Sequence, residues 1–286
     1  MREPRRRSSL AGGSPRARWA IFVLLVTAAV VYVYPFVIQV ANSFKTDGEA
    51  TRSGMSLLAD TWTTAAYTTL FSGSAFPRWF ANSVVVTLFV TAGRVLFGSM
   101  AGYALARLRF RGRQAVFAAL VGVMAVPGVV LLIPKFLVIR ELGLYNSYPG
   151  LIVPLLVDAA GVFIMKGFFE SIPVSVEEAA RIDGAGAFRV FWSVVLPMAR
   201  PALVTIVILS FQGSWNELSH FIVASSDPSL VNLTKGVAQL AGGGLGAGNQ
   251  YPLKLAAATL MTIPVAALFF IFQRRIMNTS AGAVKG

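Results

Sequence analysis

A long apolar run without a single charge constrains this chain more than any other feature. It extends from Trp19 to Phe44, and a helix that crosses the hydrocarbon core of a bilayer needs about 20 mostly apolar residues. The run is too long for the apolar part of a signal peptide, and it has no clear small-x-small cleavage site. We therefore expect an uncleaved membrane-spanning helix, preceded by the basic residues Arg5, Arg6, Arg7, Arg16 and Arg18.

Five further apolar runs of similar length follow the first. They lie at about residues 80–106, 114–134, 150–169, 202–223 and 255–273. Charged residues make up 13% of the chain, whereas soluble domains carry about 25%. The sequence therefore predicts an all-α integral membrane protein with six transmembrane helices. We see no internal repeat in it and no sign of helices broken at mid-membrane.

The basic residues predict which side of the membrane each loop faces. Seventeen Lys and Arg fall on the side that holds both termini, the Arg107–Arg113 turn and the 170–201 loop, and seven fall on the other side. Because cytoplasmic loops carry the excess of Lys and Arg, both termini are predicted to be cytoplasmic. This placement also explains the net charge of +13 without a nucleic-acid partner. With no cysteine and one histidine, the chain has no disulfide and no Cys- or His-rich metal site.

The polar loop at residues 170–201 carries its own helix signal. Ser175 followed by Glu178 has the spacing of a capping box, which predicts a helix that begins near Val176. The acidic pair Glu177-Glu178 would then lie in the first turn, where it suits the helix dipole. The helix is expected to stop at the glycines Gly184 and Gly186.

The spacing in this loop resembles the EAA motif of ABC-importer permeases. Glu178-Ala179-Ala180 is followed after three residues by Gly184, and nine residues then precede Val194-Val195-Leu196-Pro197. Other strings, in order over most of the chain, resemble the smaller permease subunits of carbohydrate-uptake importers, those similar to the maltose system. They are Asn82-Ser83, Ala101-Gly102-Tyr103-Ala104-Leu105-Ala106-Arg107, Phe110-Arg111-Gly112, Gly143-Leu144-Tyr145-Asn146-Ser147-Tyr148, Ile182-Asp183-Gly184-Ala185, Trp215-Asn216-Glu217 and Gly282-Ala283-Val284-Lys285-Gly286.

This resemblance implies the type I ABC importer permease fold, in which the EAA loop is a cytoplasmic coupling helix that docks on a separate ATPase. The implied partners are a second homologous permease in a heterodimer, two copies of the ATPase, which would bind ATP and Mg, and an extracytoplasmic sugar-binding protein. The implied location is the inner membrane of a bacterium. The residues implied to couple ATP hydrolysis to transport are Glu178, Ala179, Ala180, Asp183, Gly184, Leu196 and Pro197.

The chain itself carries no phosphate-binding loop of the form G-x-x-x-x-G-K-[ST] and no catalytic motif. We therefore expect a transport subunit that is not an enzyme and holds no cofactor. A permease of the same family for a polyamine, phosphate or peptide stays open as an alternative. So does a secondary transporter of another class, for which inverted repeats and broken helices would be typical.

The expected layout is a basic cytoplasmic N-terminus (1–18), a first span with an external loop (19–74), a permease core of five spans (75–273) and a cytoplasmic tail (274–286). The external Gly-rich segment Ala241–Gly248 is either a contact for the binding protein or its substrate, or a slack connector.

Several polar residues fall at membrane depth, where ionisable groups usually mark function. Two roles stay open for them: they tie helices together, or they line a sugar pathway, with Trp215 as an aromatic platform. Arg94 is expected deeper in the membrane than Asp158, so a direct pair between them would have to bridge this difference in depth. His220 is expected at the membrane interface. The pathway candidates are Asp158, Gln212, Trp215, Asn216 and Glu217.

Overall fold

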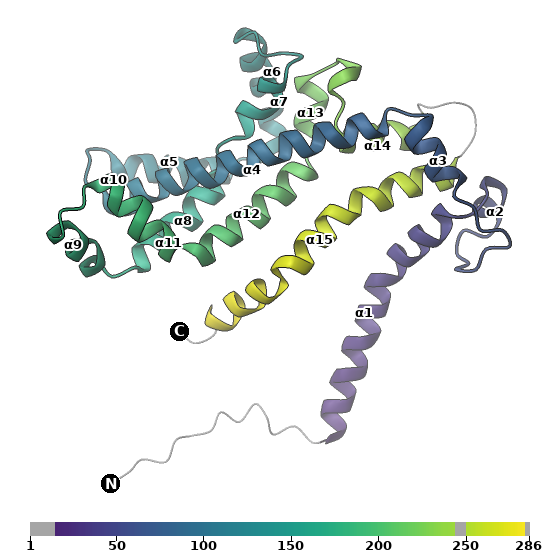
Figure 1. Ribbon diagram of the computed structural model, residues 1–286, viewed down its shortest axis with the longest axis horizontal. Helices are drawn as coiled ribbons and strands as arrows, with labels where there is room; N and C mark the ends of the chain where they lie inside the picture. The colour runs from purple at the N-terminus through teal and green to yellow at the C-terminus, as the bar shows by residue number, and fades with distance from the viewer. Residues whose placement is uncertain (1–14, 244–249, 284–286) are drawn as a thin grey trace. The chain divides into compact units, whose positions relative to one another are not determined.

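The computed structural model describes residues 15–243 and 250–283, and within these ranges the chain is helical and contains no strand (Figure 1). This confirms the predicted all-α class. The predictions for the basic residues before Pro15, for residues 244–248 of the Gly-rich segment and for residues 284–286 lie outside the described residues. The elements are α1 (Pro15–Ser43), α2 (Asp47–Arg52), α3 (Ala65–Ser72), α4 (Phe76–Arg107), α5 (Arg113–Met124), η2 (Gly128–Leu131), α6 (Leu132–Glu141), α7 (Tyr148–Ile152), η3 (Val153–Leu155), α8 (Ala159–Ser171), α9 (Val174–Ile182), α10 (Ala187–Arg189), η4 (Val190–Val195), α11 (Leu196–Met198), α12 (Arg200–Trp215), α13 (Ser219–Ala224), η5 (Pro228–Leu230), α14 (Leu233–Ala241) and α15 (Tyr251–Ala283).

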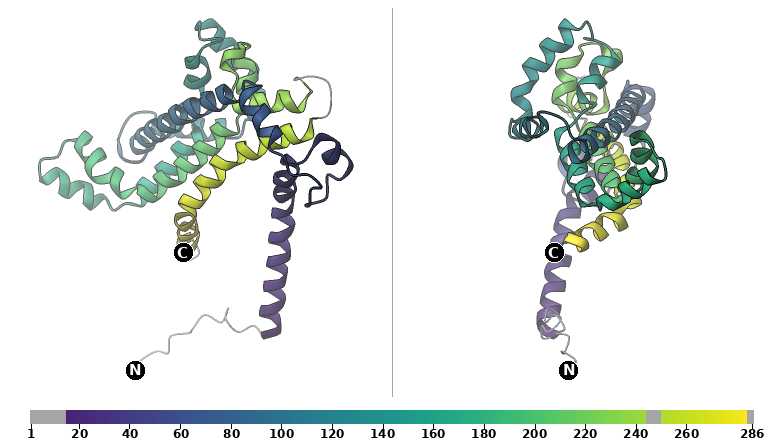
Figure 2. Two further views of the ribbon diagram at one scale, coloured as in Figure 1. Left: turned by 45° about the vertical axis from the view of Figure 1, so that its right-hand side comes forward. Right: turned by 90° about the vertical axis from the view of Figure 1, so that its left-hand side faces the viewer.

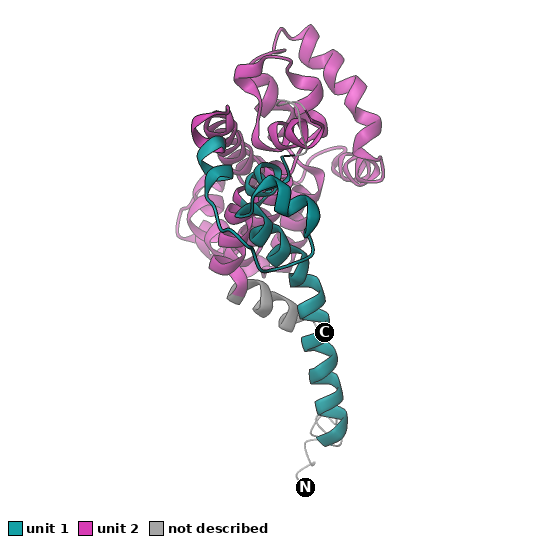
Figure 3. Ribbon diagram, turned by 90° about the vertical axis from the view of Figure 1, so that its right-hand side faces the viewer, with its two compact units in different colours: residues 1–69, 249–259 teal, residues 70–248, 260–286 magenta. Residues whose placement is uncertain are grey.

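The chain divides into two units, coloured in Figure 3: residues 1–69 with 249–259, and residues 70–248 with 260–286. The first unit contains α1, α2 and the beginning of α15. Within it, Gln39 of α1 donates a hydrogen bond of 3.3 Å to the Thr259 hydroxyl of α15. Just beyond α1, the Phe44 ring packs on the Tyr67 ring, with centroids 4.8 Å apart.

Three helices are each long and apolar enough to cross a membrane: α1, α4 and residues 251–273 of α15. Three more candidate spans are helix pairs bent at a short break. They are α5 with residues 128–141 (104°), residues 148–155 with α8 (40°), and residues 187–198 with α12 (80°). The described residues thus contain six spans when each bent pair counts as one. The helix α15 continues to Ala283, so the predicted tail is helical up to that residue.

The prediction of uninterrupted helices is wrong at three places. The run predicted at 114–134 breaks after Met124, next to Pro127, which has no backbone N–H and disfavours helical backbone at the residue before it. In the fourth run, α8 begins only at Ala159. In the fifth, α12 ends at Trp215, and α13 begins at Ser219. A count of apolar residues misses these breaks because each is short and has apolar residues on both sides.

The second unit is built on α4, which packs along α8 and α12 (Figures 1 and 2). Gly102 permits the close approach of α8, since a Cβ there would lie 2.7 Å from the Met165 Cβ and 2.9 Å from the Lys166 backbone nitrogen. The ring of the next residue, Tyr103, packs edge-on against Phe169, at 5.7 Å, and contacts Phe191 at 5.0 Å. This buried aromatic cluster forms the platform that carries the 170–201 loop.

Candidate functional site

The helix of the polar loop, α9, begins earlier than its sequence predicts. It starts at Val174, directly after Pro173, and no side chain caps its N-terminus. Ser175 therefore lies inside the first turn and cannot act as the cap, so the predicted capping box is wrong. Because of this shift Glu177 lies in the first turn and Glu178 does not. The proline, with its fixed φ, defines the start of the helix instead.

The C-terminus of α9 agrees with the prediction. Gly184 has φ of +82°, a conformation that favours glycine. Its N–H donates to the Arg181 carbonyl at 3.0 Å, and the Ala185 N–H reaches back to the Ala180 carbonyl at 3.0 Å. This pair of bonds is a Schellman motif, which satisfies carbonyls that the end of a helix leaves unpaired. Gly184 thus fixes where α9 ends.

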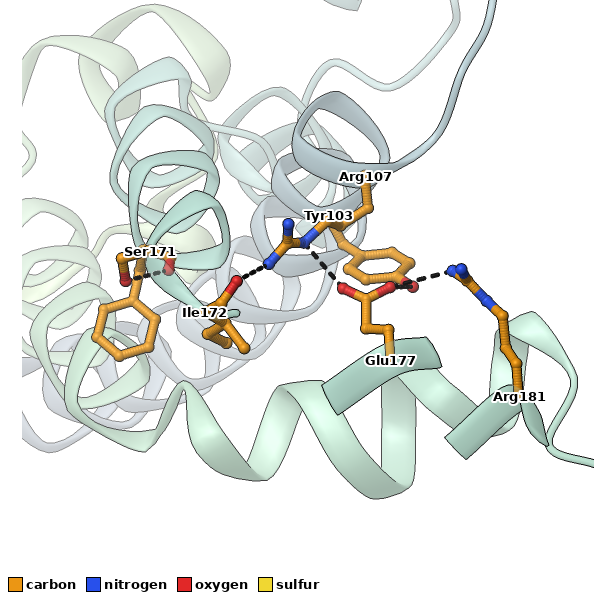
Figure 4. Close-up of polar contacts among 7 residues, drawn as sticks. Tyr103, Arg107, Ser171, Ile172, Glu177 and Arg181 are labelled. Atoms are coloured by element: carbon orange, nitrogen blue, oxygen red, sulfur yellow. Dashed lines mark hydrogen bonds and ion pairs between the residues drawn. The ribbon is translucent and has the colours of Figure 1, made fainter. Parts of the chain in front are cut away.

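A buried ion-pair network ties α9 to the end of α4, as Figure 4 shows. The centre of the network is Glu177, whose residue is 1% exposed. One carboxylate oxygen lies 2.8 Å from the Arg107 Nε. The other accepts hydrogen bonds of 3.1 Å from the Tyr103 hydroxyl and from Arg181 Nη2. Arg107 Nη2 also donates to the carbonyl of Ile172, just before α9. Two residues one turn apart on α4 thus hold both the start and the first turn of α9.

Sequence reasoning missed the role of Glu177. Its place beside the EAA motif suggested only a favourable interaction with the helix dipole. The available signal was the pair Tyr103 and Arg107, which have i,i+4 spacing at the end of a span and belong to a string already noted. Side chains with this spacing share one face of a helix and can bind a single group.

The opposite side of α9 is exposed and holds most of the predicted coupling residues. Glu178, Ala179, Asp183 and Gly184 are all exposed, whereas Ala180 is half-buried and packs against the aromatic platform. The predicted Leu196 and Pro197 lie apart from this surface, in α11, where Leu196 also packs against the platform.

Apolar side chains accompany the polar ones on this exposed surface, which the sequence reading did not anticipate. Ile182 is 86% exposed, Phe188 is 73% exposed, and Val174 is exposed as well. Large exposed apolar side chains within one loop can serve protein contact. We refer to Val174, Glu178, Ala179, Ile182, Asp183 and Phe188 as the α9 surface.

The chain returns from the α9 surface to α12 through a π-helix, η4. Its side chains Val190, Phe191 and Val195 are buried in the same platform that receives Ala180. In a π-helix each hydrogen bond joins residues five apart, one more than in an α-helix. Such segments are frequent at functional sites. The α9 surface is thus connected to α4 through Glu177 and to α12 through η4.

The acidic residues at membrane depth cap the broken helices. Asp158 accepts hydrogen bonds from the Ala160 and Gly161 N–H groups at the start of α8. Glu217 accepts one of 2.9 Å from the His220 N–H in α13. Across the break in the fourth span, Arg94 Nε donates to the Leu155 carbonyl at 2.7 Å. Arg94 thus makes a hydrogen bond to the backbone rather than a direct pair with Asp158.

The other pathway candidates divide into exposed and buried. Gln212 and Asn216 are exposed on α12 and beside its end. The Trp215 ring is buried, stacks on Phe211 at 5.6 Å and donates from Nε1 to the Met261 carbonyl. This burial favours the alternative, that Trp215 ties helices together, and its role as an aromatic platform for sugar stays a prediction.

His220 is also buried within the fold. Its Nε2 lies 3.2 Å from the Leu151 carbonyl of α7. An apolar groove of about 520 Å³ runs between α4 and α12, but the predicted pathway residues are not among those that line it. The pathway role of Gln212 and Asn216 stays a prediction.

Comparison with known proteins gives a consistent result. The family model described as "Binding-protein-dependent transport system inner membrane component" matches residues 94–278. The chain is 33% identical to the diacetylchitobiose uptake system permease protein of Streptomyces coelicolor, covering 90% of this chain and 85% of the relative. It is 34% identical to the sulfoquinovosyl glycerol transport system permease protein of Agrobacterium fabrum, covering 98% and 96%. Among solved structures, a chain of a bacterial ABC transporter involved in the import of the acidic polysaccharide alginate matches with a TM-score of 0.78 and 28% identity, over 92% of this chain and 98% of that one.

Proposed function

This chain belongs to the family of binding-protein-dependent transport system inner membrane components. We therefore propose that it forms half of the membrane channel of an ATP-driven importer. We also propose that the ATPase subunit docks on the α9 surface and moves it. The observation that carries this proposal is the contrast between the two sides of α9. One side is fixed to α4 by the buried Glu177, and the other presents exposed apolar and polar side chains.

The proposed solute is a sugar or an oligosaccharide, delivered by an external binding protein. The relatives named above are permease proteins of a diacetylchitobiose uptake system and a sulfoquinovosyl glycerol transport system, and the solved structure is of an ABC transporter involved in the import of the acidic polysaccharide alginate. A polyamine, phosphate or peptide is the alternative. Affinity of the partner binding protein over a panel of sugars distinguishes these solutes.

The proposed assembly contains this chain, a second homologous permease, two copies of a cytoplasmic ATPase that bind ATP and Mg, and the binding protein. It lies in a bacterial inner membrane, with both termini in the cytoplasm. In the proposed cycle, ATP binding draws the two ATPase copies together and displaces α9. Since Glu177 links α9 to α4 and η4 links it to α12, both spans move with it and open the channel toward the outside. Hydrolysis then resets the channel.

A bulky residue on the α9 surface tests this proposal. Ala179→Trp places a large ring on an exposed position that makes no packing contact with the platform, so the chain is expected to fold and insert normally. We expect the variant to lose the ATPase on purification and to lose uptake. The matched control is Gln114→Trp, on the exposed end of α5. ATPase association and uptake at the control level in Ala179→Trp would exclude the α9 surface as the docking site.

A further inference from the structure

The loop after α1 folds back along that helix rather than extending beyond it. Asn42, one residue before the end of α1, donates a hydrogen bond of 2.7 Å to the Gly54 carbonyl. The Tyr34 hydroxyl lies 3.5 Å from the Met55 carbonyl. Tyr34 precedes the last residue of α1 by nine residues, which is about 14 Å along the helix axis. The backbone at Gly54 and Met55 therefore lies beside the last turns of α1, on the N-terminal side of the residue at which α1 ends.

Polar groups of this loop are satisfied from within the first unit. Lys45 is buried, and its Nζ donates to the carbonyls of Ser53 at 3.0 Å and Ser56 at 2.7 Å. The Asp60 N–H donates to Glu49 Oε1 at 2.7 Å. Irregular backbone next to lipid needs such internal partners, because hydrocarbon offers none. In a loop that faces water, a lysine side chain usually extends into the solvent. Lys45 instead points inward, and its charged Nζ binds carbonyls.

The side chains that point outward from the same loop are apolar. Leu58 is 80% exposed and Met55 is 73% exposed, and Leu57 and Trp62 are exposed with them. The charged and hydroxyl side chains of α2 that precede them, such as Thr51 and Arg52, are exposed too. The loop therefore presents an apolar part and a polar part, the arrangement of segments that lie in a membrane interface.

We propose that Met55, Leu57, Leu58 and Trp62 anchor this loop in the lipid leaflet beside the C-terminal end of α1. In the orientation predicted from the basic residues this is the outer leaflet. Lipid fits better than a docked binding protein because the loop backbone lies level with turns of α1 that are themselves apolar and membrane-spanning. Tryptophan at the edge of the loop suits the headgroup region. The proposal depends on the membrane placement of α1 and is independent of the solute that is transported.

Site-directed spin labelling tests it, since the native chain has no cysteine to remove. A nitroxide is attached to Leu58→Cys in the assembled transporter, reconstituted in phosphatidylglycerol–phosphatidylethanolamine vesicles. The matched control is Thr51→Cys on α2, in the same loop and also exposed. We expect the label at position 58 to collide more with apolar oxygen than with a water-soluble nickel chelate, by several-fold relative to the label at position 51.

Two results would overturn the anchor. Equal and high accessibility to the nickel chelate at positions 58 and 51 would place the loop in water. Low accessibility of position 58 to both reagents would place it against another protein, and repeating the measurement with and without the binding protein would identify which one.

Discussion

At the scale of single residues, Glu177 matters most to the position of α9. Its carboxylate is surrounded by Arg107, Arg181 and Tyr103 and is shielded from water. Arg181 is half-exposed, so solvent screens its attraction to the Glu177 carboxylate, and exposed ion pairs contribute little to stability. Arg107 is nearly buried, and its Nε lies 2.8 Å from the carboxylate. Removal of one partner of such a pair leaves a buried charge without compensation.

Glu177→Gln should therefore destabilise the protein by about 3–5 kcal/mol, the usual cost of breaking a buried ion pair. The exposed neighbour Glu178→Gln is the matched control and should change stability by less than about 0.5 kcal/mol. The midpoint of thermal unfolding of the purified transporter in detergent measures both. The double replacement Glu177→Met with Arg107→Met should be more stable than Glu177→Gln, since an apolar pair leaves no unpaired charge. Equal midpoints for Glu177→Gln and Glu178→Gln would contradict the assignment.

At this scale the sequence predicted local features well and distant contacts poorly. The stop at Gly184 depends only on the backbone of adjacent residues, and it was found. The partner of Glu177 is Arg107, which lies 70 positions earlier in the chain, and no local pattern connects the two. The acidic residues Asp158 and Glu217 were recognised as unusual, but their hydrogen bonds to helix starts could not be foreseen while the helices were expected to be continuous.

At the scale of elements, the close packing of α4 on α8 determines where the platform forms. Gly102 lies at the crossing, where a methyl group has no room. The contrast within the same pair of helices is Gly167 of α8, around which a Cβ would meet nothing within 4 Å. The two glycines thus predict opposite effects of the same substitution.

Gly102→Ala should destabilise the protein by about 1–3 kcal/mol through overpacking against Met165. Gly167→Ala should be neutral or stabilising by up to about 1 kcal/mol, because alanine is the better helix former. Thermal unfolding midpoints of the two variants, compared with that of the native chain, give the answer. A Gly102→Ala midpoint equal to or above that of Gly167→Ala would mean that the two helices are further apart than the structure has them.

The membrane spans show what hydropathy alone can predict about the helices. All six apolar runs correspond to helical segments of the structure. The breaks at Pro127, Asp158 and Asn216 escaped prediction because apolar residues stand on both sides of each. The helix–break–helix pattern arises from backbone groups that find partners in Asp158, Glu217 and Arg94.

At the scale of the whole molecule, the membrane orientation follows from charge and has a direct test. The bias of 17 basic residues against seven predicts cytoplasmic termini. It equally predicts that the α9 surface is cytoplasmic and that α2 and the segment around Ser226 are external. The absence of cysteine from the native chain makes each position accessible to a clean chemical probe.

A membrane-impermeant maleimide applied to intact spheroplasts should label Thr51→Cys and Ser226→Cys, which are both exposed and predicted to be external. It should label Gln114→Cys and Glu178→Cys only after the membrane is permeabilised. Labelling of all four after permeabilisation is the control for access. Reaction of Glu178→Cys in intact spheroplasts would reverse the orientation and remove the α9 surface from the compartment that contains ATP.

The π-helix η4 marks the place where the 170–201 loop can lose one residue without losing its direction. A π-helical turn is an α-helix that contains one additional residue, and each residue of an α-helix turns the chain by about 100°. Deletion of one residue between Val190 and Val195 is therefore expected to restore regular helical geometry, because the wider turn absorbs the change and the flanking segments keep their direction. Glu177 would then still face Arg107. A deletion from the regular helix α12 would instead rotate the segment before it by about 100°.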